Sequence, residues 1–385
     1  VNDNVTVWGK EKVGGIIGIN EGQIGEANGT YLTCQAKSVR ATNGLVGGIA
    51  GTTDGNIQYA RNRSASVSAD AGYAGGIVAE NNEGHTIANC ENYGNVNSSN
   101  GYAGGISSIN YGTITACKVV GTTTAQVTIS SRGTDEIGAI TAINETTGVI
   151  SDSAPETNVK LDGQATVFGG VAGVNQGRIK PSSGTADYKM SYMPQISSAK
   201  KQITVGGAAG LNEGTIEKVR VTLNFEKFNT YQYLGGIAGQ NGAQTKAASS
   251  AKITECAYSG TITETGGAAG NCYGGITGIN YAKLENCTIP QINMNIQGVY
   301  TATSTSTAEQ KEQLASHAGG IAGKNETNGV ITGCLLTDTD KSKLSAEYGM
   351  LGGVTGFNKG TINLSGSDKT ATIMTNLTDA ASGKE

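Results

Sequence analysis

The 385-residue chain contains 59 glycines, 4 prolines and only 15% charged residues, a composition that excludes a mainly helical protein, a collagen and a proline-rich linker. Its hydrophobic content of 37% is too high for a disordered chain, so we expect a buried core. The formal net charge is -4 and the 27 lysines and arginines are scattered, which argues against nucleic acid or an anionic membrane surface as a partner. No run approaches the roughly 18 apolar residues of a membrane-spanning helix, so we expect no direct membrane insertion.

A glycine pair recurs along most of the chain and marks eleven similar units. The spacing between successive pairs never falls below 28 residues, and it grows where a loop can be inserted. The first glycines of the units are Gly14, Gly47, Gly75, Gly104, Gly138 (followed by alanine), Gly169, Gly206, Gly235, Gly274, Gly319 and Gly352. Repeats of this length are typical of solenoids. We therefore expect a lead-in segment over residues 1–12, a single repeat domain over residues 13–363 and a C-terminal tail over residues 364–385.

The pattern of apolar residues in each unit predicts three short strands. Apolar residues flank the glycine pair, as at Val46 and Ile49, and the broken two-residue period between them indicates a bend at the pair. A second strand is centred on Ile24, Ile57, Ile87, Ile114, Ile150, Ile179, Ile216, Ile253, Leu284, Ile331 and Ile362. A looser third strand is indicated by Val67, Val96, Val127, Val159, Val221, Ile262 and Ile292. An antiparallel sandwich would not keep one side-chain type at each slot over eleven units.

Bends rather than hairpins join these strands, so each strand should stack on its counterpart in the next unit. The pattern therefore predicts an all-β fold, a parallel β-solenoid of about eleven coils with surface insertions. We expect a right-handed β-helix, from the general preference of parallel crossover connections. The longest insertions cover residues 181–201 and 301–317, and we expect both to be surface loops.

An asparagine follows the glycine pair at a fixed distance in ten of the eleven units, and Thr53 is the exception. The asparagines are Asn20, Asn81, Asn110, Asn144, Asn175, Asn212, Asn241, Asn280, Asn325 and Asn358. Asparagine tolerates turn conformations and bonds to turn backbone. Stacked at one corner of successive coils, the amides can also bond to one another, so we predict a structural ladder.

The seven cysteines and two histidines are the candidates for metal or redox chemistry. Without a Cys-x-x-Cys pair or a Cys/His spacing typical of zinc, we predict no metal site. His85 and His317 belong to no catalytic motif, so we expect both on the surface and predict no catalytic or cofactor-binding residue and no cofactor. Five cysteines share one slot: Cys90, Cys117, Cys256, Cys287 and Cys334. We interpret these as buried free thiols, with a bridge between Cys90 and Cys117 left open.

A polysaccharide lyase or hydrolase is the alternative function, because elongated β-helices host such enzymes. Their sites need carboxylates clustered on one outer face together with Lys or Arg. Acids near the asparagine corner, such as Asp54, Glu83, Asp135 and Glu213, fall in different units and share no slot. We therefore predict that the chain is not an enzyme.

Tyrosines at the position two before the glycine pair are the candidate ligand contacts. Tyr73 and Tyr102 fall on adjacent coils, and Tyr233 recurs in the same slot later. Stacked aromatic rings on a solvated face can hold a sugar ring or a protein partner, although tyrosine is also simply favoured in strands.

The aligned unit reads Gly-Gly-Ile-Ala-Gly-Lys-Asn at residues 319–325 and Gly-Gly-Val-Ala-Gly-Val-Asn-Gln-Gly-Arg-Ile at residues 169–179. It resembles the GLUG repeat of large bacterial surface proteins, and the resemblance covers nearly the whole chain. Such repeats occur in adhesin-like cell-wall proteins and outside the catalytic domain of some IgA-cleaving metallopeptidases. The resemblance implies a non-catalytic structural or adhesive rod that is extracellular, on a bacterial cell surface. The implied partner is a host or microbial surface protein or a glycan.

Overall fold

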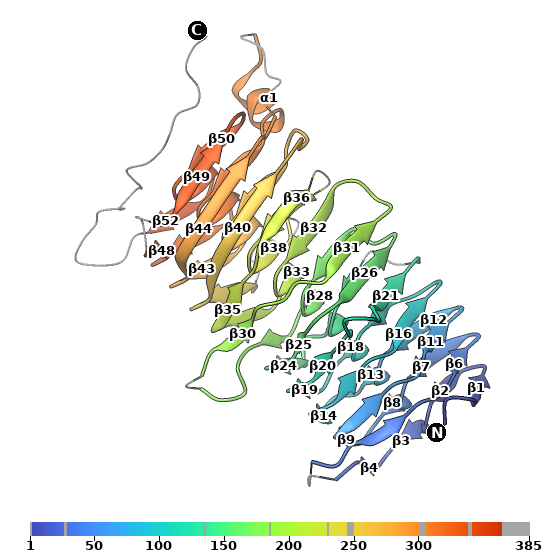
Figure 1. Ribbon diagram of the computed structural model, residues 1–385. Helices are drawn as coiled ribbons and strands as arrows, with labels where there is room; N and C mark the ends of the chain where they lie inside the picture. Colours follow the sequence, from blue (N-terminus) through green and yellow to red (C-terminus); the bar gives the residue numbers. More distant parts are fainter. Residues whose placement is uncertain are drawn as a thin grey trace. The chain divides into compact units, whose positions relative to one another are not determined.

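The computed structural model describes residues 2–26, 29–133, 136–184, 186–228, 231–244, 250–299, 305–337 and 341–363. The chain divides into two compact units: unit 1 comprises Val1–Tyr188 and Tyr192–Lys200, and unit 2 comprises Lys189–Ser191 and Lys201–Glu385. In Figure 1 the strands of unit 1 run from blue to green and those of unit 2 from yellow-green to red. The predicted tail over residues 364–385 lies outside the described residues.

Unit 1 contains six coils, and the strands of successive coils pair in parallel. Sheet A consists of β1 (Thr6–Gly9), β6 (Ser38–Ala41), β11 (Ser66–Ala69), β16 (Asn95–Ser98), β21 (Val127–Ser131), β26 (Val159–Gly163) and β31 (Gln195–Ser198). Sheet B consists of β2 (Lys12–Gly14), β7 (Gly44–Gly47), β12 (Gly72–Gly75), β17 (Ala103–Gly104), β22 (Glu136–Gly138) and β27 (Val167–Gly169). Sheet C consists of β3 (Ile17–Asn20), β8 (Ala50–Thr53), β13 (Val78–Asn81), β18 (Ser107–Asn110), β23 (Thr141–Asn144) and β28 (Ala172–Asn175).

Two further sheets complete the coils of unit 1. Sheet D consists of β4 (Gln23–Ile24), β9 (Asn56–Gln58), β14 (Thr86–Ala88), β19 (Thr113–Thr115), β24 (Val149–Ser151) and β29 (Arg178–Ile179). Sheet E consists of β5 (Leu32–Cys34), β10 (Ala60–Asn62), β15 (Glu91–Asn92), β20 (Lys118–Val119) and β25 (Ala154–Pro155). The strand β30 (Tyr188–Met190) contributes Tyr188 to unit 1 and its next two residues to unit 2.

Unit 2 contains five coils built from the counterparts of sheets B, C and D, here called B′, C′ and D′, and from a separate sheet F. Sheet B′ consists of β32 (Ile203–Gly206), β37 (Tyr231–Gly235), β41 (Cys272–Gly274), β45 (His317–Gly319) and β50 (Met350–Gly352). Sheet C′ consists of β33 (Ala209–Asn212), β38 (Ala238–Asn241), β42 (Thr277–Asn280), β46 (Ala322–Asn325) and β51 (Thr355–Asn358). Sheet D′ consists of β34 (Thr215–Glu217), β39 (Lys252–Thr254), β43 (Lys283–Glu285), β47 (Val330–Thr332) and β52 (Thr361–Asn363). Sheet F includes β35 (Val219–Thr222), β36 (Phe225–Phe228), β40 (Ala257–Glu264), β44 (Thr288–Ile296), β48 (Leu335–Leu336) and β49 (Lys343–Ala346).

The register of the parallel strands places the same type of side chain at the same position in successive coils. In sheet D, Ile87 pairs with Ile57 on one side and with Ile114 on the other, and all three are fully buried. Stacked isoleucines of this kind form continuous apolar files through the core of each unit. The predicted all-β parallel β-solenoid is therefore confirmed, while its right-handed turn stays a prediction.

The coils of unit 1 contain five short strands where the sequence predicted three. The bend at the glycine pair divides the predicted first strand into the strands of sheets B and C, and sheet E was not predicted at all. Its strands have only two or three residues, too few to show a two-residue period. Residues 6–9, placed in the lead-in, form β1 and pair with β6. In sheet A, Val96 pairs with Ile129, two residues beyond the predicted Val127.

Close backbone approach explains the glycine pair. A Cβ atom on Gly47 would lie 1.8 Å from the carbonyl oxygen of Ala50, and one on Gly48 would lie 2.2 Å from that of Gly76 in the next coil. Neither glycine has a positive φ. Space, and not an unusual backbone conformation, therefore explains glycine at these two positions. In another unit the second position holds Ala139, which is fully buried.

A left-handed corner follows the strands of sheets D and D′ and was missed in the sequence. The residue two places after the buried Ile or Leu has φ near +50° although it is not glycine, at Tyr59, Asn89, Ala116, Asp152, Lys218, Glu255 and Asn286. Gly333 occupies the same corner with φ 63°. This conformation normally favours glycine, and its recurrence shows that the stacked coils impose the corner on whichever residue stands there.

The two insertions contain regular structure. The segment predicted as a loop over residues 181–201 includes β30 and β31, and Tyr188 of β30 is only 1% exposed. Of the segment over residues 301–317, the part from 305 is described, and it contains α1 (Ala308–Gln313). The surface position expected for His317 is wrong, because this residue begins β45 and is 1% exposed.

Candidate functional site

Two ladders of asparagine side chains run through the units at the ends of the sheet C and C′ strands. In each step the Nδ2 of one asparagine donates to the Oδ1 of the asparagine in the next coil, at 2.7 or 2.8 Å. The steps join Asn81, Asn110, Asn144 and Asn175 in unit 1, and Asn212, Asn241, Asn280, Asn325 and Asn358 in unit 2. Side chains thus add to the backbone bonds between coils, which stiffens each unit as a scaffold.

Thr53 interrupts the ladder of unit 1. Its hydroxyl accepts from Asn20 Nδ2 at 3.0 Å and donates to the carbonyl oxygen of Gly55 at 2.7 Å. The Oδ1 atom of Asn81, in the next coil, is buried and has no hydrogen-bond partner among the described residues. An unsatisfied buried acceptor costs stability, so this step is a local weakness of the scaffold.

The structure brings Tyr73 and Tyr102 together. Their ring centroids are 5.2 Å apart with a tilt of 36° between the ring planes, and both side chains are half-buried. Tyr73 also acts on Tyr111: burial raises the pKa of Tyr111, and the charges of Glu145 and Glu80 and the hydroxyl of Tyr73 raise it further. This tyrosine pair therefore combines aromatic surface with hydroxyl groups.

Tyr233 does not belong to the tyrosine pair. It lies in unit 2, where β37 places it in register with Cys272 of β41. Burial raises the pKa of Tyr233 to about 12. The shared slot seen in the sequence is real, but in the coil after Tyr233 this slot holds the buried thiol of Cys272 and not a tyrosine.

Sheet E carries a cluster that sequence reasoning missed. The carboxylate of Glu91 accepts from the hydroxyls of Tyr31 at 3.0 Å and Tyr93 at 2.9 Å and from Arg61 Nε at 2.8 Å. The guanidinium of Arg61 lies 3.9 Å from the Tyr31 ring centroid, and that of Arg63 lies 4.8 Å from the Tyr93 centroid. Burial alone would raise the pKa of Glu91, but these hydrogen bonds outweigh it and lower the pKa. These residues lie in the strands of sheet E or directly next to them, and the shortness of these strands hid the cluster in the sequence.

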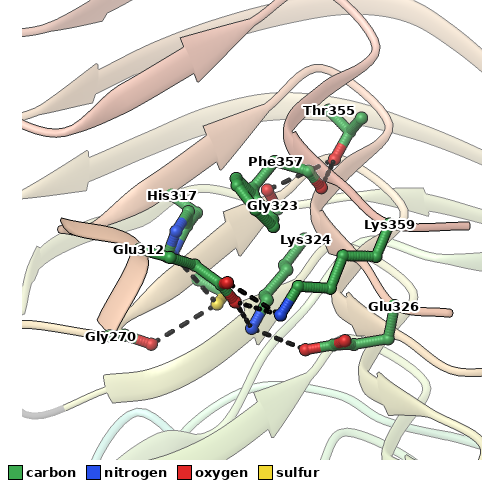
Figure 2. A network of polar contacts seen from close by, with 10 residues as sticks. Gly270, Glu312, His317, Gly323, Lys324, Glu326, Thr355, Phe357 and Lys359 are labelled. Atoms are coloured by element: carbon green, nitrogen blue, oxygen red, sulfur yellow. Dashed lines mark hydrogen bonds and ion pairs between the residues drawn. The ribbon is translucent and has the colours of Figure 1, made fainter. Parts of the chain in front are cut away.

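A second cluster was also missed, in unit 2. Lys324 Nζ lies 2.6 Å from Glu312 Oε1 and 2.5 Å from Glu326 Oε1, and Lys359 Nζ lies 2.7 Å from Glu312 Oε2. We call these four residues the ion-pair cluster; Figure 2 shows it with the neighbouring His317. The cluster joins Glu312 of α1 to Lys324 of β46 and to Lys359, which follows β51. Its members do not share one position in the repeat, so the repeat pattern does not predict it.

Cys272 and His317 lie beside the ion-pair cluster, with His317 Nδ1 3.8 Å from Cys272 Sγ. Burial lowers the pKa of His317 to about 4 and raises the pKa of Cys272 to about 12. Both groups are therefore neutral near pH 7. An activated thiolate needs the opposite shifts, with a lowered thiol pKa beside a protonated imidazole, so this pair does not form a nucleophilic centre.

All seven cysteines are free and buried: Cys34, Cys90, Cys117, Cys256, Cys272, Cys287 and Cys334. Cys90 and Cys117 lie on neighbouring coils, and the Cys90 backbone N–H donates to Cys117 Sγ at 3.4 Å. Among the residues that the structure describes, no three His, Cys, Asp or Glu side chains are grouped so that they could hold a metal ion.

Comparisons with protein-family models, with curated proteins and with solved structures find no match to this chain. In the described part of the chain, no helix is both long enough and apolar enough to cross a membrane. The function of each candidate site is therefore inferred from the geometry of the site itself.

Proposed function

We propose that the chain is a non-catalytic, structural and adhesive repeat region of an extracellular bacterial surface protein, as its resemblance to the GLUG repeat implies. The observation that supports this proposal is the regular scaffold. Backbone pairing and the buried asparagine ladders join consecutive coils within each unit. A rigid frame of this kind holds side chains on its surface in fixed positions, where recognition usually resides.

The tyrosine pair is the binding surface that we propose, with a surface glycan as its ligand. The 5.2 Å separation of the Tyr73 and Tyr102 rings lets one ligand touch both. Aromatic side chains offer an apolar face with a polar tip, which matches a sugar ring with its apolar face and its hydroxyl groups. Tyr111, whose pKa Tyr73 raises, adds a further hydroxyl group near the pair.

A glycan array followed by a double substitution tests this surface. Tyr73→Ser together with Tyr102→Ser should weaken binding of an array hit at least tenfold, because the ligand loses both rings, while the melting temperature stays nearly unchanged. The matched control is Tyr348→Ser, which removes a tyrosine that is 53% exposed in unit 2. Undiminished binding by the double variant would remove the tyrosine pair from consideration.

A carbohydrate-active enzyme is the second candidate, and Glu80 is the residue that favours it. Burial raises the pKa of Glu80, Lys12 opposes this effect and Asp54 adds to it. A carboxyl group with a raised pKa beside aromatic residues is the type of group that acts as a general acid in glycoside hydrolysis. Digestion of a polysaccharide panel separates the two functions: release of oligosaccharides that Glu80→Gln abolishes would replace the adhesive function with the enzymatic one.

A further inference from the structure

The ion-pair cluster holds one carboxylate in an unusually complete set of contacts. Glu312 reaches from α1, its side chain is 7% exposed, and both of its oxygens are paired with lysine ammonium groups: Lys359 contacts Oε1 and Oε2, and Lys324 contacts Oε1. Figure 2 shows both lysines directed at this carboxylate. The two lysines belong to the solenoid strands and the following corner, whereas Glu312 belongs to the insertion.

The surroundings of this carboxylate contain unused binding groups. The Nε2 atom of His317 is buried and has no hydrogen-bond partner among the described residues. The ring of Phe357 lies 5.6 Å from the His317 ring, centroid to centroid, and its centroid is 5.8 Å from Lys324 Nζ and 5.5 Å from Lys359 Nζ. Two cations therefore contact Glu312, and beside these cations lie an aromatic ring and an imidazole with an unpaired nitrogen.

We propose that Lys324, Lys359, Phe357 and His317 form a binding site for a carboxylate-bearing sugar, and that Glu312 occupies it as an internal ligand. The lysines match the carboxylate, as they do with Glu312. Phe357 offers an apolar surface for the sugar ring, and His317 Nε2 offers a hydrogen bond to a hydroxyl group. A peptide glutamate supplies the carboxylate but has no sugar ring to lie on Phe357, which is why a uronic acid fits the site better.

Charge explains why Glu312 controls this site. With Glu312 in place, two ammonium groups face the carboxylates of Glu312 and Glu326. When Glu312 is removed, two ammonium groups face a single carboxylate, so the site becomes cationic. An external uronate must compete with Glu312 in the native chain, and binding is therefore held weak until the α1 segment releases its carboxylate.

Isothermal titration with trigalacturonate tests the site in the whole chain. Glu312→Ala should bind trigalacturonate at least tenfold more tightly than the native chain, and adding Lys324→Met to this variant should abolish the gain. The matched control is Glu309→Ala, which removes an exposed acid from the same helix without emptying the site. Equal affinities of the Glu312→Ala and Glu309→Ala variants would overturn the proposal.

Two further ligands test the chemical class. Galactotriose, which lacks the carboxylates, should bind the Glu312→Ala variant at least tenfold more weakly than trigalacturonate. Hexaglutamate should also bind more weakly, and tighter binding of the peptide would overturn the assignment to a sugar. The inference depends on the proposed function in one respect, the choice of a glycan as the class of ligand. It concerns residues of unit 2, so failure here leaves the tyrosine pair of unit 1 untouched, and the reverse also holds.

Discussion

The two units share half of their coil and differ in the other half. Sheets B, C and D of unit 1 and sheets B′, C′ and D′ of unit 2 have the same glycine pair, the same buried isoleucines and the same asparagine ladder. The rest of the coil differs. Unit 1 has the separate sheets A and E, with strands of two to five residues, whereas unit 2 has sheet F, in which β40 and β44 have 8 and 9 residues.

This difference shows which part of a coil bears the structural constraint. The half with the glycine pair has little room for change: a Cβ atom on Gly47 or Gly48 would overlap the backbone of its own or the next coil, and one of the eleven units replaces a glycine of the pair, by the small Ala139. The other half only has to supply a buried apolar face to the core, which strands of any length can do. New side-chain clusters therefore arise where the coil is variable or interrupted, as at Glu91 in sheet E and at Glu312 in α1.

The largest effect is expected from a charge placed in the shared half of either unit. Ile77 and Ile237 occupy the same slot and are fully buried. Ile77→Asp and Ile237→Asp should each lower the free energy of unfolding by about 4 kcal/mol or more, because an unpaired carboxylate replaces a core side chain. The measurement is chemical denaturation followed by circular dichroism.

The matched control for this pair is Asn293→Asp, an exposed position on β44 in the variable half of unit 2, with an expected change within about 0.5 kcal/mol. If Ile237→Asp were as mild as this control, the shared half would not be the constrained part of the coil.

A smaller effect, confined to unit 2, is expected from His317 on acidification. Burial lowers the pKa of His317 to about 4; Lys324 and Lys359 also lower it, and Glu312 and Glu326 oppose them. The unfolded histidine titrates near 6.5, so the folded state gains stability from neutral His317 above that pH and loses it as the pH falls towards 4. Between pH 7 and pH 5 the loss should be about 2 kcal/mol.

The variant His317→Asn isolates this contribution, because it cannot take up the proton. Denaturation at pH 7 and pH 5 should show that the native chain loses about 2 kcal/mol more than the variant. An identical pH dependence in both chains would contradict the assignment of the acid sensitivity to this side chain.

The smallest expected effect is a gain in stability. It comes from a substitution that supplies the asparagine missing at position 53, so that the ladder of unit 1 becomes as continuous as that of unit 2. Thr53→Asn should let position 53 accept from Asn20 and donate to the unpaired Oδ1 of Asn81. The completed ladder should raise the free energy of unfolding by about 1 kcal/mol, the net value of one buried hydrogen bond. Thr86→Asn, at a half-buried position on β14, is the control and should give no comparable gain.

The sequence predicts the shared half of the coil well, because stacking repeats one environment at each slot. The glycine pairs, the isoleucines such as Ile87 and the asparagines such as Asn110 can all be placed from their spacing alone. Sheet E could not be found, since strands such as β15 have two residues and show no period. The left-handed corner could not be found either, because residues as different as Tyr59 and Lys218 occupy it.

The candidate sites also divide into one that the repeat spacing predicts and one that it does not. Tyr73 and Tyr102 share a slot on adjacent coils, and this alone predicted their contact. The ion-pair cluster joins Glu312 to Lys324 and to Lys359, which is 47 residues away, across an insertion of irregular length. Contacts between an insertion and the repeat depend on how the insertion folds back onto the coils. The spacing of the repeats does not predict this path.

The buried thiols give the chain an internal reporter of coil opening. Burial raises the pKa of Cys90 and Cys272, and alkylation or disulfide exchange requires the thiolate, so these cysteines are protected while their coils are closed. Cys34, Cys90 and Cys117 lie in unit 1, and Cys256, Cys272, Cys287 and Cys334 lie in unit 2. Locating the labelled cysteines by peptide mapping and mass spectrometry therefore tells which coils have opened, without any engineered probe.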